Sequence, residues 1–111
     1  MSSIEKGNAA NAEDFGGWFM GHFLPEDSLM STSGLEVKWS QLKKGETRDE
    51  WAPVIDRKTV AVLIRGHLIV EFPNEEVELR SEGDYVIWKD VSHNFRTIED
   101  SVVLTIRWPS I

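Results

Sequence analysis

His93, Arg48 and Arg107 are the residues of this 111-residue chain that we single out for acid–base or anion-binding chemistry. The chain contains no cysteine, which excludes a cysteine nucleophile and thiolate metal ligands. The three histidines, His22, His67 and His93, are too scattered to form the spacing of a metal site. A tightly held transition metal needs about three or four protein ligands. No Ser-His-Asp set, phosphate-binding loop or paired-carboxylate spacing is found either. We therefore predict no metal and no cofactor, and His93 is a structural hydrogen-bonding residue or a lone general base.

Arg48 and Arg107 are the candidates for binding an anion. A guanidinium group matches a carboxylate through two parallel hydrogen bonds. Arg107 lies inside a predicted strand, with Val103 and Thr105 on its own side. Two interpretations stay open: these arginines face solvent or pair with carboxylates of the protein, or they present guanidinium groups to an anionic ligand in a pocket.

Tryptophan is abundant, with five in the chain. Aromatic side chains bury large areas, so the tryptophans could simply fill a core. The alternative is an aromatic-walled pocket for a planar or sugar-like ligand, which a small barrel can hold. The tryptophans that lie on or beside predicted strands are Trp39, Trp51, Trp88 and Trp108.

Charge and composition exclude several classes of partner. A net charge of −7 argues against nucleic acids and anionic membranes, both of which attract clustered basic residues. No apolar run approaches the ~20 residues that a membrane-spanning helix needs, and the first residues lack the pattern of a secretion signal. Because the chain has no cysteine, it suits the reducing cytosol, and we expect a soluble cytoplasmic protein.

Strands are the elements expected to position these residues. Apolar residues alternate with polar ones, and glycine, proline and acidic turns follow at intervals of about ten residues. In the first strand the alternation puts Leu35, Val37 and Trp39 on the buried side. Short strands so spaced predict a sandwich or a closed barrel. The expected strands cover residues 35–39, 59–64, 68–72, 77–79, 85–88 and 102–108.

The N-terminal part of the chain differs from the rest. Residues 1–14 are small, polar and acidic, and predict a flexible arm. Residues 15–111 are predicted to form one domain. Aromatic residues crowd among glycines between Phe15 and Phe23, which indicates an irregular segment packed onto the barrel.

Three segments, taken together, resemble the cupin family. Residues 59–66 resemble the end of the first cupin motif, where a ligand Glu, six residues and a Gly close a hairpin. Residues 83–93 resemble the second motif, G-D-x-x-x-x-P-P-G-V-P-H, and residues 99–104 are similar to a closing cupin strand. The end of the chain, 107–110, resembles a group of short bacterial cupins. The resemblance implies an all-β, cupin-type double-stranded β-helix (RmlC-like jelly-roll barrel).

The chain departs from the cupin pattern where the family holds its metal. Residues 51–53 contain no His-x-His, Thr59 stands at the position of the Glu, and His93 alone keeps a ligand-like position. If Thr59 points inward, Ala61 and Leu63 do so too. The resemblance therefore implies a barrel without the family's standard metal site. The candidates for lining its pocket are His93, Trp51, Trp88, Thr59, Arg48, Arg107 and Trp39.

Three functions remain open. The first is binding of a small ligand, anionic or sugar-like, without a standard metal site. The second is a small cupin enzyme of isomerase, lyase or oxygenase type, which would use His93 with a non-standard metal or acid–base set. The third is a structural or assembly module. Residues 60–64 are apolar on both faces, so either the Phe15–Phe23 segment or a second subunit should cover them; the resemblance favours a homodimer.

Overall fold

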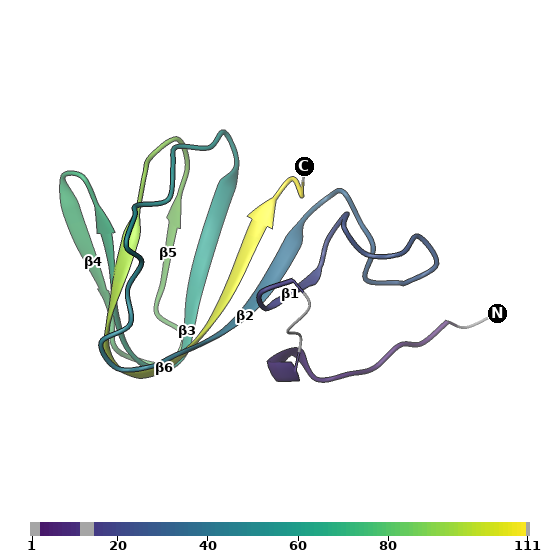
Figure 1. Cartoon of the computed structure of the whole chain (residues 1–111), viewed down its shortest axis with the longest axis horizontal. Helices are drawn as coiled ribbons and strands as arrows, with labels where there is room; N and C mark the ends of the chain where they lie inside the picture. The colour runs from purple at the N-terminus through teal and green to yellow at the C-terminus, as the bar shows by residue number, and fades with distance from the viewer. Residues whose placement is uncertain (1–2, 12–14, 111) are drawn as a thin grey trace.

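Strands dominate the architecture of the computed structural model, which describes residues 3–11 and 15–110. One 3-10 turn, η1 (Ala9–Asn11), precedes the strands. All strands belong to one antiparallel sheet in the order β1-β2-β6-β3-β4, and β5 also pairs with β3 (Figure 1). Within the described residues, no helix is long and apolar enough to cross a membrane. The strands are β1 (Trp18–Met20), β2 (Glu36–Leu42), β3 (Lys58–Phe72), β4 (Glu75–Leu79), β5 (Tyr85–Trp88) and β6 (Asn94–Trp108).

The two longest strands, β3 and β6, bend together, and the bend folds the sheet over itself (Figure 1). Their pairing shifts register between Leu63 and Leu68, opposite Ser101. The prediction of two strands, 59–64 and 68–72, joined by a hairpin at Gly66 was wrong. The structure has one continuous strand, in which Gly66 marks the bend.

Gly66 is required at the bend for two reasons. Its φ is 113°, a conformation that L-residues rarely adopt. A Cβ atom at this position would also overlap Ser101 Oγ and the carbonyl oxygen of Asp100. The buried Ser101 Oγ accepts a hydrogen bond from His67 N at 3.0 Å, and the Glu99 carbonyl lies 2.7 Å from the same oxygen. A side-chain hydroxyl therefore replaces backbone pairing where the register shifts.

The hydrophobic core lies inside the folded sheet. As predicted, Thr59, Ala61 and Leu63 of β3 all point inward and are buried. The other buried members of the core are Leu68, Val70, Leu79 and Val103. Four of these core residues, Ala61, Leu68, Val70 and Val103, also line the open cavity described below.

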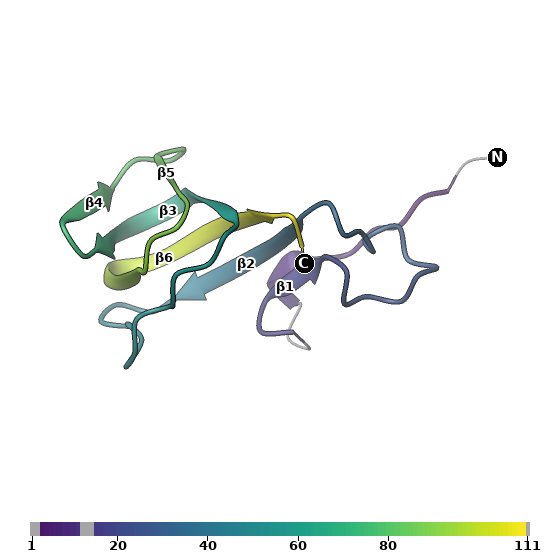
Figure 2. The same cartoon turned by 90° about the horizontal axis from the view of Figure 1, so that it is seen from above.

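The N-terminal part packs along the free edge of β2. Strand β1 pairs with β2, and Figure 2 shows this part extending away from the end of the sheet that carries β4. Glu5 accepts hydrogen bonds from Ser28 Oγ (3.1 Å) and from the backbone N–H of Leu29. The flexible arm predicted for residues 1–14 remains a prediction, since residues 1, 2 and 12–14 lie outside the described residues.

Candidate functional site

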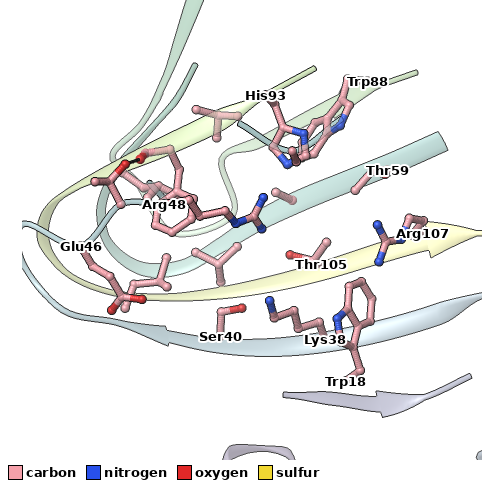
Figure 3. Close-up of a pocket in the computed structure, with 18 residues that line it drawn as sticks. Trp18, Lys38, Ser40, Glu46, Arg48, Thr59, Trp88, His93, Thr105 and Arg107 are labelled. Atoms are coloured by element: carbon pink, nitrogen blue, oxygen red, sulfur yellow. Dashed lines mark hydrogen bonds between the residues drawn. The ribbon is translucent and has the colours of Figure 1, made fainter. Parts of the chain in front are cut away.

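An open cavity of about 320 Å³ lies inside the folded sheet. Side chains from β1, β2, β3, β5, β6 and the segment between β2 and β3 reach it (Figure 3). Its aromatic and apolar walls include Trp18, Trp88 and Phe95. Its polar and charged groups are Lys38, Ser40, Glu46, Thr47, Arg48, Thr59, His93, Thr105 and Arg107.

Strand β2 turns its polar side toward the cavity. Lys38, Ser40 and Leu42 line the cavity, so the alternation of a strand places Trp39 on the opposite face. The prediction that Trp39 lines the pocket was therefore wrong. The polar–apolar alternation of β2 does not show which side faces the cavity, because the outer face of the sheet is apolar too.

Arg107 is held at the end of the cavity by a buried carboxylate. Its Nε lies 2.7 Å from Glu36 Oε1, and Glu36 is only 5% exposed. Arg57 Nη1 lies 3.3 Å from the same oxygen, and Ser110 Oγ donates to Oε2 at 3.0 Å. The guanidinium carbon of Arg107 also lies 4.5 Å from the centre of the Trp18 ring. These contacts fix Arg107 while its guanidinium points into the cavity (Figure 3).

Arg48 is positioned by backbone pairing of the segment between β2 and β3. The side-chain amide of the buried Asn94 donates to the Arg48 carbonyl at 3.0 Å. Further along, Ala52 N donates to the His93 carbonyl at 2.8 Å. The Arg48 guanidinium carbon lies 5.5 Å from the centre of the Phe95 ring, and the group points into the cavity (Figure 3).

His93 and Trp88 form the opposite wall. Their ring centroids are 4.6 Å apart, and the ring centroids of Trp88 and Phe72 are 5.5 Å apart. The Nδ1 atom of His93 is buried and has no hydrogen-bond partner among the described residues. Burial, followed by the charges of Arg48 and Arg107, lowers the pKa of His93 to about 4. His93 is therefore a neutral imidazole at pH 7.

The cavity is electropositive although the chain carries a net charge of −7. Lys38, Arg48 and Arg107 supply three cations, and Glu46 is the one acidic side chain among the described lining residues. Burial is the main cause that lowers the pKa of Lys38, and Arg48 and Arg107 lower it further, while Glu46 raises it. Burial also lowers the pKa of Arg107, which the pairing with Glu36 opposes. An anion placed here would relieve the repulsion among these cations.

The structure brings five of the seven predicted pocket residues to one cavity: His93, Trp88, Thr59, Arg48 and Arg107. Trp39 faces outward, as described above. The prediction for Trp51 is also corrected, because its side chain is 43% exposed and the neighbouring Ala52 reaches the cavity instead.

Several lining residues were not predicted from the sequence, among them Lys38, Trp18 and Glu46. Lys38 lies on the polar side of a strand, where a solvent-facing position is the ordinary expectation. Trp18 comes from β1, in a segment whose pairing with β2 no periodicity signals. The high content of tryptophan is the one sequence feature that could have drawn attention to Trp18.

A metal of the kind that many cupins hold does not fit the residues present. Within residues 3–11 and 15–110, no three His, Asp or Glu side chains cluster as a metal site. Around His93 the charged neighbours are the cations Arg48 and Arg107, which repel a metal cation.

Comparison with known proteins identifies the fold. No family model matches the chain, and no curated protein matches it in sequence. Solved structures do match. KdgF from a Halomonas species superposes with a TM-score of 0.63 at 20% identity, covering 70% of this chain and 72% of that chain. An RmlC-like cupin from Desulfovibrio desulfuricans superposes with a TM-score of 0.62 at 16% identity, covering 73% and 77%.

A putative ethanolamine utilization protein Q from Salmonella typhimurium is a third match, with a TM-score of 0.59 and 19% identity over 71% of this chain and 61% of that chain. These likenesses, together with the antiparallel sheet folded over a central cavity, establish the cupin-type jelly roll that the sequence predicted. The chain is thus a small all-β protein with the cupin fold.

Proposed function

We propose that this protein binds a small organic anion in the cavity and that the bound ligand contacts the protein's own side chains without a metal. The observation that carries the proposal is the convergence of three cationic side chains, Lys38, Arg48 and Arg107, in one cavity of an acidic chain. Guanidinium groups bind carboxylates through paired hydrogen bonds. Small-ligand pockets typically combine apolar walls with a few placed polar groups, as this cavity does.

The lining residues also suggest which groups the ligand carries besides its negative charge. Trp18 and Trp88 offer aromatic surface on opposite sides of the cavity, and the hydroxyls of Ser40 and Thr105 face it. A ligand that carries a carboxylate and a hydroxyl or carbonyl group would satisfy both the cations and these hydroxyls.

The experiment is a thermal-unfolding screen with matched pairs of compounds. Succinate is compared with succinamide, and glucuronate with glucose, so that each pair differs in negative charge. The proposal expects the anion of a pair to raise the melting temperature and the neutral compound to leave it unchanged. The proposal fails if both compounds of a pair raise the melting temperature equally, or if neither anion raises it.

The enzyme alternative based on His93 has less support. A general base needs a group that orients it, and the Nδ1 atom of His93 is buried without a partner among the described residues. Its lowered pKa also makes it a weak base.

A second proposal concerns assembly: the outer face of the sheet is covered by a second copy of the chain. Two rows of apolar side chains cross β2, β6, β3 and β5 in register. At the β5 end of these rows, Tyr85 is 66% exposed and Ile87 is 53% exposed. An apolar face of this kind is typical of an interface, and twofold dimers are the commonest assembly. The rows are Val37–Ile106–Val60–Ile87 and Trp39–Leu104–Val62–Tyr85.

A cytoplasmic location and a bacterial origin also remain predictions.

A further inference from the structure

Lys38 differs from the two arginines of the cavity in being an amine that can act as a nucleophile. It lies on the inner side of β2, where its backbone pairs with Thr105 of β6 and with Trp18 of β1. Its Nζ atom lies 5.6 Å from the centre of the Trp18 ring. Among the described residues, no carboxylate forms an ion pair with it. Figure 3 shows the amine pointing into the cavity, where a ligand can reach it.

The groups that face Lys38 favour its neutral form. Arg48 comes from the segment between β2 and β3, and Arg107 comes from β6; both repel a charged ammonium group. Glu46 is the opposing charge, and His93 across the cavity is neutral. Burial, the largest cause, and the two arginines lower the pKa of Lys38, while Glu46 raises it. A lysine that is desolvated or lies beside other cations is an activated amine nucleophile.

The three cations can therefore have two separate roles. Arginine stays protonated in proteins, so Arg48 and Arg107 remain available to hold a carboxylate. Lysine can lose its proton, and a neutral Lys38 would reduce the repulsion among the three groups. A site that needed charge alone would already have it in the two guanidinium groups.

We propose that Lys38 forms an imine (Schiff base) with the carbonyl carbon of a 2-oxo acid whose carboxylate is held by Arg48 and Arg107. The inference rests on the proposed anion site and names its ligand class. The neutral amine adds to the carbonyl carbon, and one of its protons passes to the carbonyl oxygen to give a carbinolamine. The nitrogen then gives up its second proton to the same oxygen, which leaves as water, and a carbon–nitrogen double bond remains. The step needs no oxidant and no reductant.

Reductive trapping of the full chain tests this inference. The protein is incubated at neutral pH with pyruvate or 2-oxoglutarate and cyanoborohydride, which reduces an imine to a stable amine. Intact mass spectrometry then measures the adduct, and peptide mapping locates it. Lactate and 2-hydroxyglutarate, which lack the carbonyl group, serve as binding probes in calorimetry. The variants are Lys38→Arg, which keeps a positive charge, and Lys58→Arg, which removes an exposed lysine of β3 as the matched control.

The inference expects one adduct per chain, located at Lys38, and a trapping rate at least about tenfold lower in Lys38→Arg. Lys58→Arg should react like the natural protein. Trapping at Lys38 should also be suppressed by excess 2-hydroxyglutarate. Mapping on the natural protein keeps the test valid even if Lys38→Arg fails to fold.

Two negative results are distinguishable. If 2-hydroxyglutarate or lactate binds but no adduct forms, or if adducts form equally at exposed lysines, the imine is excluded and the anion site stands. If neither the hydroxy acids nor the 2-oxo acids bind and no adduct forms, both proposals fail.

Discussion

The Nε atom of Arg107 lies 2.7 Å from the Oε1 atom of Glu36, a carboxylate that the fold buries almost completely. Glu36 also forms an ion pair with Arg57 and accepts a hydrogen bond from the hydroxyl of Ser110. It therefore links β2, β6 and the segment before β3. A structural ion pair thus sets the position of an arginine that we assign to ligand binding.

Removing the charge of Glu36 should destabilise the protein strongly. Glu36→Gln leaves Arg107 and Arg57 without their buried counter-charge, and we expect a loss of about 2–4 kcal/mol in the free energy of unfolding. Denaturant titration measures it. Glu78→Gln is the control, because Glu78 is half exposed beside His67 and should cost no more than about 1 kcal/mol. Equal losses of unfolding free energy in the two variants would show that the buried pairing of Glu36 stabilises the fold no more than the exposed pairing of Glu78.

The pH dependence of stability should show a contribution from His93. Its pKa is about 4 in the folded chain against an ordinary value of 6.5, so between these values the unfolded chain binds more protons. Stability should therefore fall as the pH drops from 6.5 to 4. Because the cavity is open to solvent, we expect the contribution to be about 1–2 kcal/mol.

His93→Gln, which cannot titrate, is the matched variant for that measurement. The difference in unfolding free energy between the natural chain and His93→Gln should change across this range, in the direction that favours the variant at acid pH. Parallel curves from pH 6.5 to 4 would mean that His93 does not have the lowered pKa.

The bend at Gly66 gives a prediction about backbone geometry. Gly66→Ala introduces both a strained φ of 113° and a clash with Ser101, whereas Gly83→Ala introduces a positive φ of 90° in open space. We expect Gly83→Ala to cost about 1–2 kcal/mol and Gly66→Ala at least about 2 kcal/mol more. Thermal unfolding of both variants compares them. If Gly66→Ala were the milder of the two, the bend would not depend on the close approach of Ser101.

The apolar outer face predicts a dimer that a single charge disrupts. Light scattering after gel filtration should give twice the chain mass for the natural protein and the mass of one chain for Tyr85→Lys. Val54→Lys changes a similarly exposed apolar residue that lies outside the two rows and should stay dimeric. A natural protein that is monomeric at high micromolar concentration would contradict the assembly proposal.

The sequence predicted the fold and most of the strands because these follow from local patterns, and five of the seven residues proposed for the pocket lie at the cavity. Turn residues mark the ends of strands. The inward direction of Thr59, Ala61 and Leu63 followed from the resemblance to the cupin motif, because residues 60–64 are apolar on both faces. The continuity of β3 was missed because an Arg-Gly pair looks like a turn, and only the distant Ser101 makes it a bend.

The inner face of β2 was missed for a different physical reason. Alternation shows that a strand has two unlike faces, but it does not show which face a polar cavity uses. Here Val37, which is already buried within the chain, and Trp39 lie on the face away from the cavity, and Lys38 faces the cavity. The position of Arg48 depends on its pairing with Asn94, a contact between residues 46 positions apart.

We expect cationic side chains of the cavity to bind a small organic anion. Calorimetric titration with succinate and glucuronate measures this binding in the natural chain, in Arg48→Gln and in the exposed-arginine control Arg80→Gln. We expect the anion to bind the natural chain and Arg80→Gln alike, more weakly at high salt, and to lose about tenfold in affinity, or about 1.4 kcal/mol, in Arg48→Gln. Absence of binding to the natural chain, or equal affinity in Arg48→Gln, would show that the cavity is not an anion site of this kind.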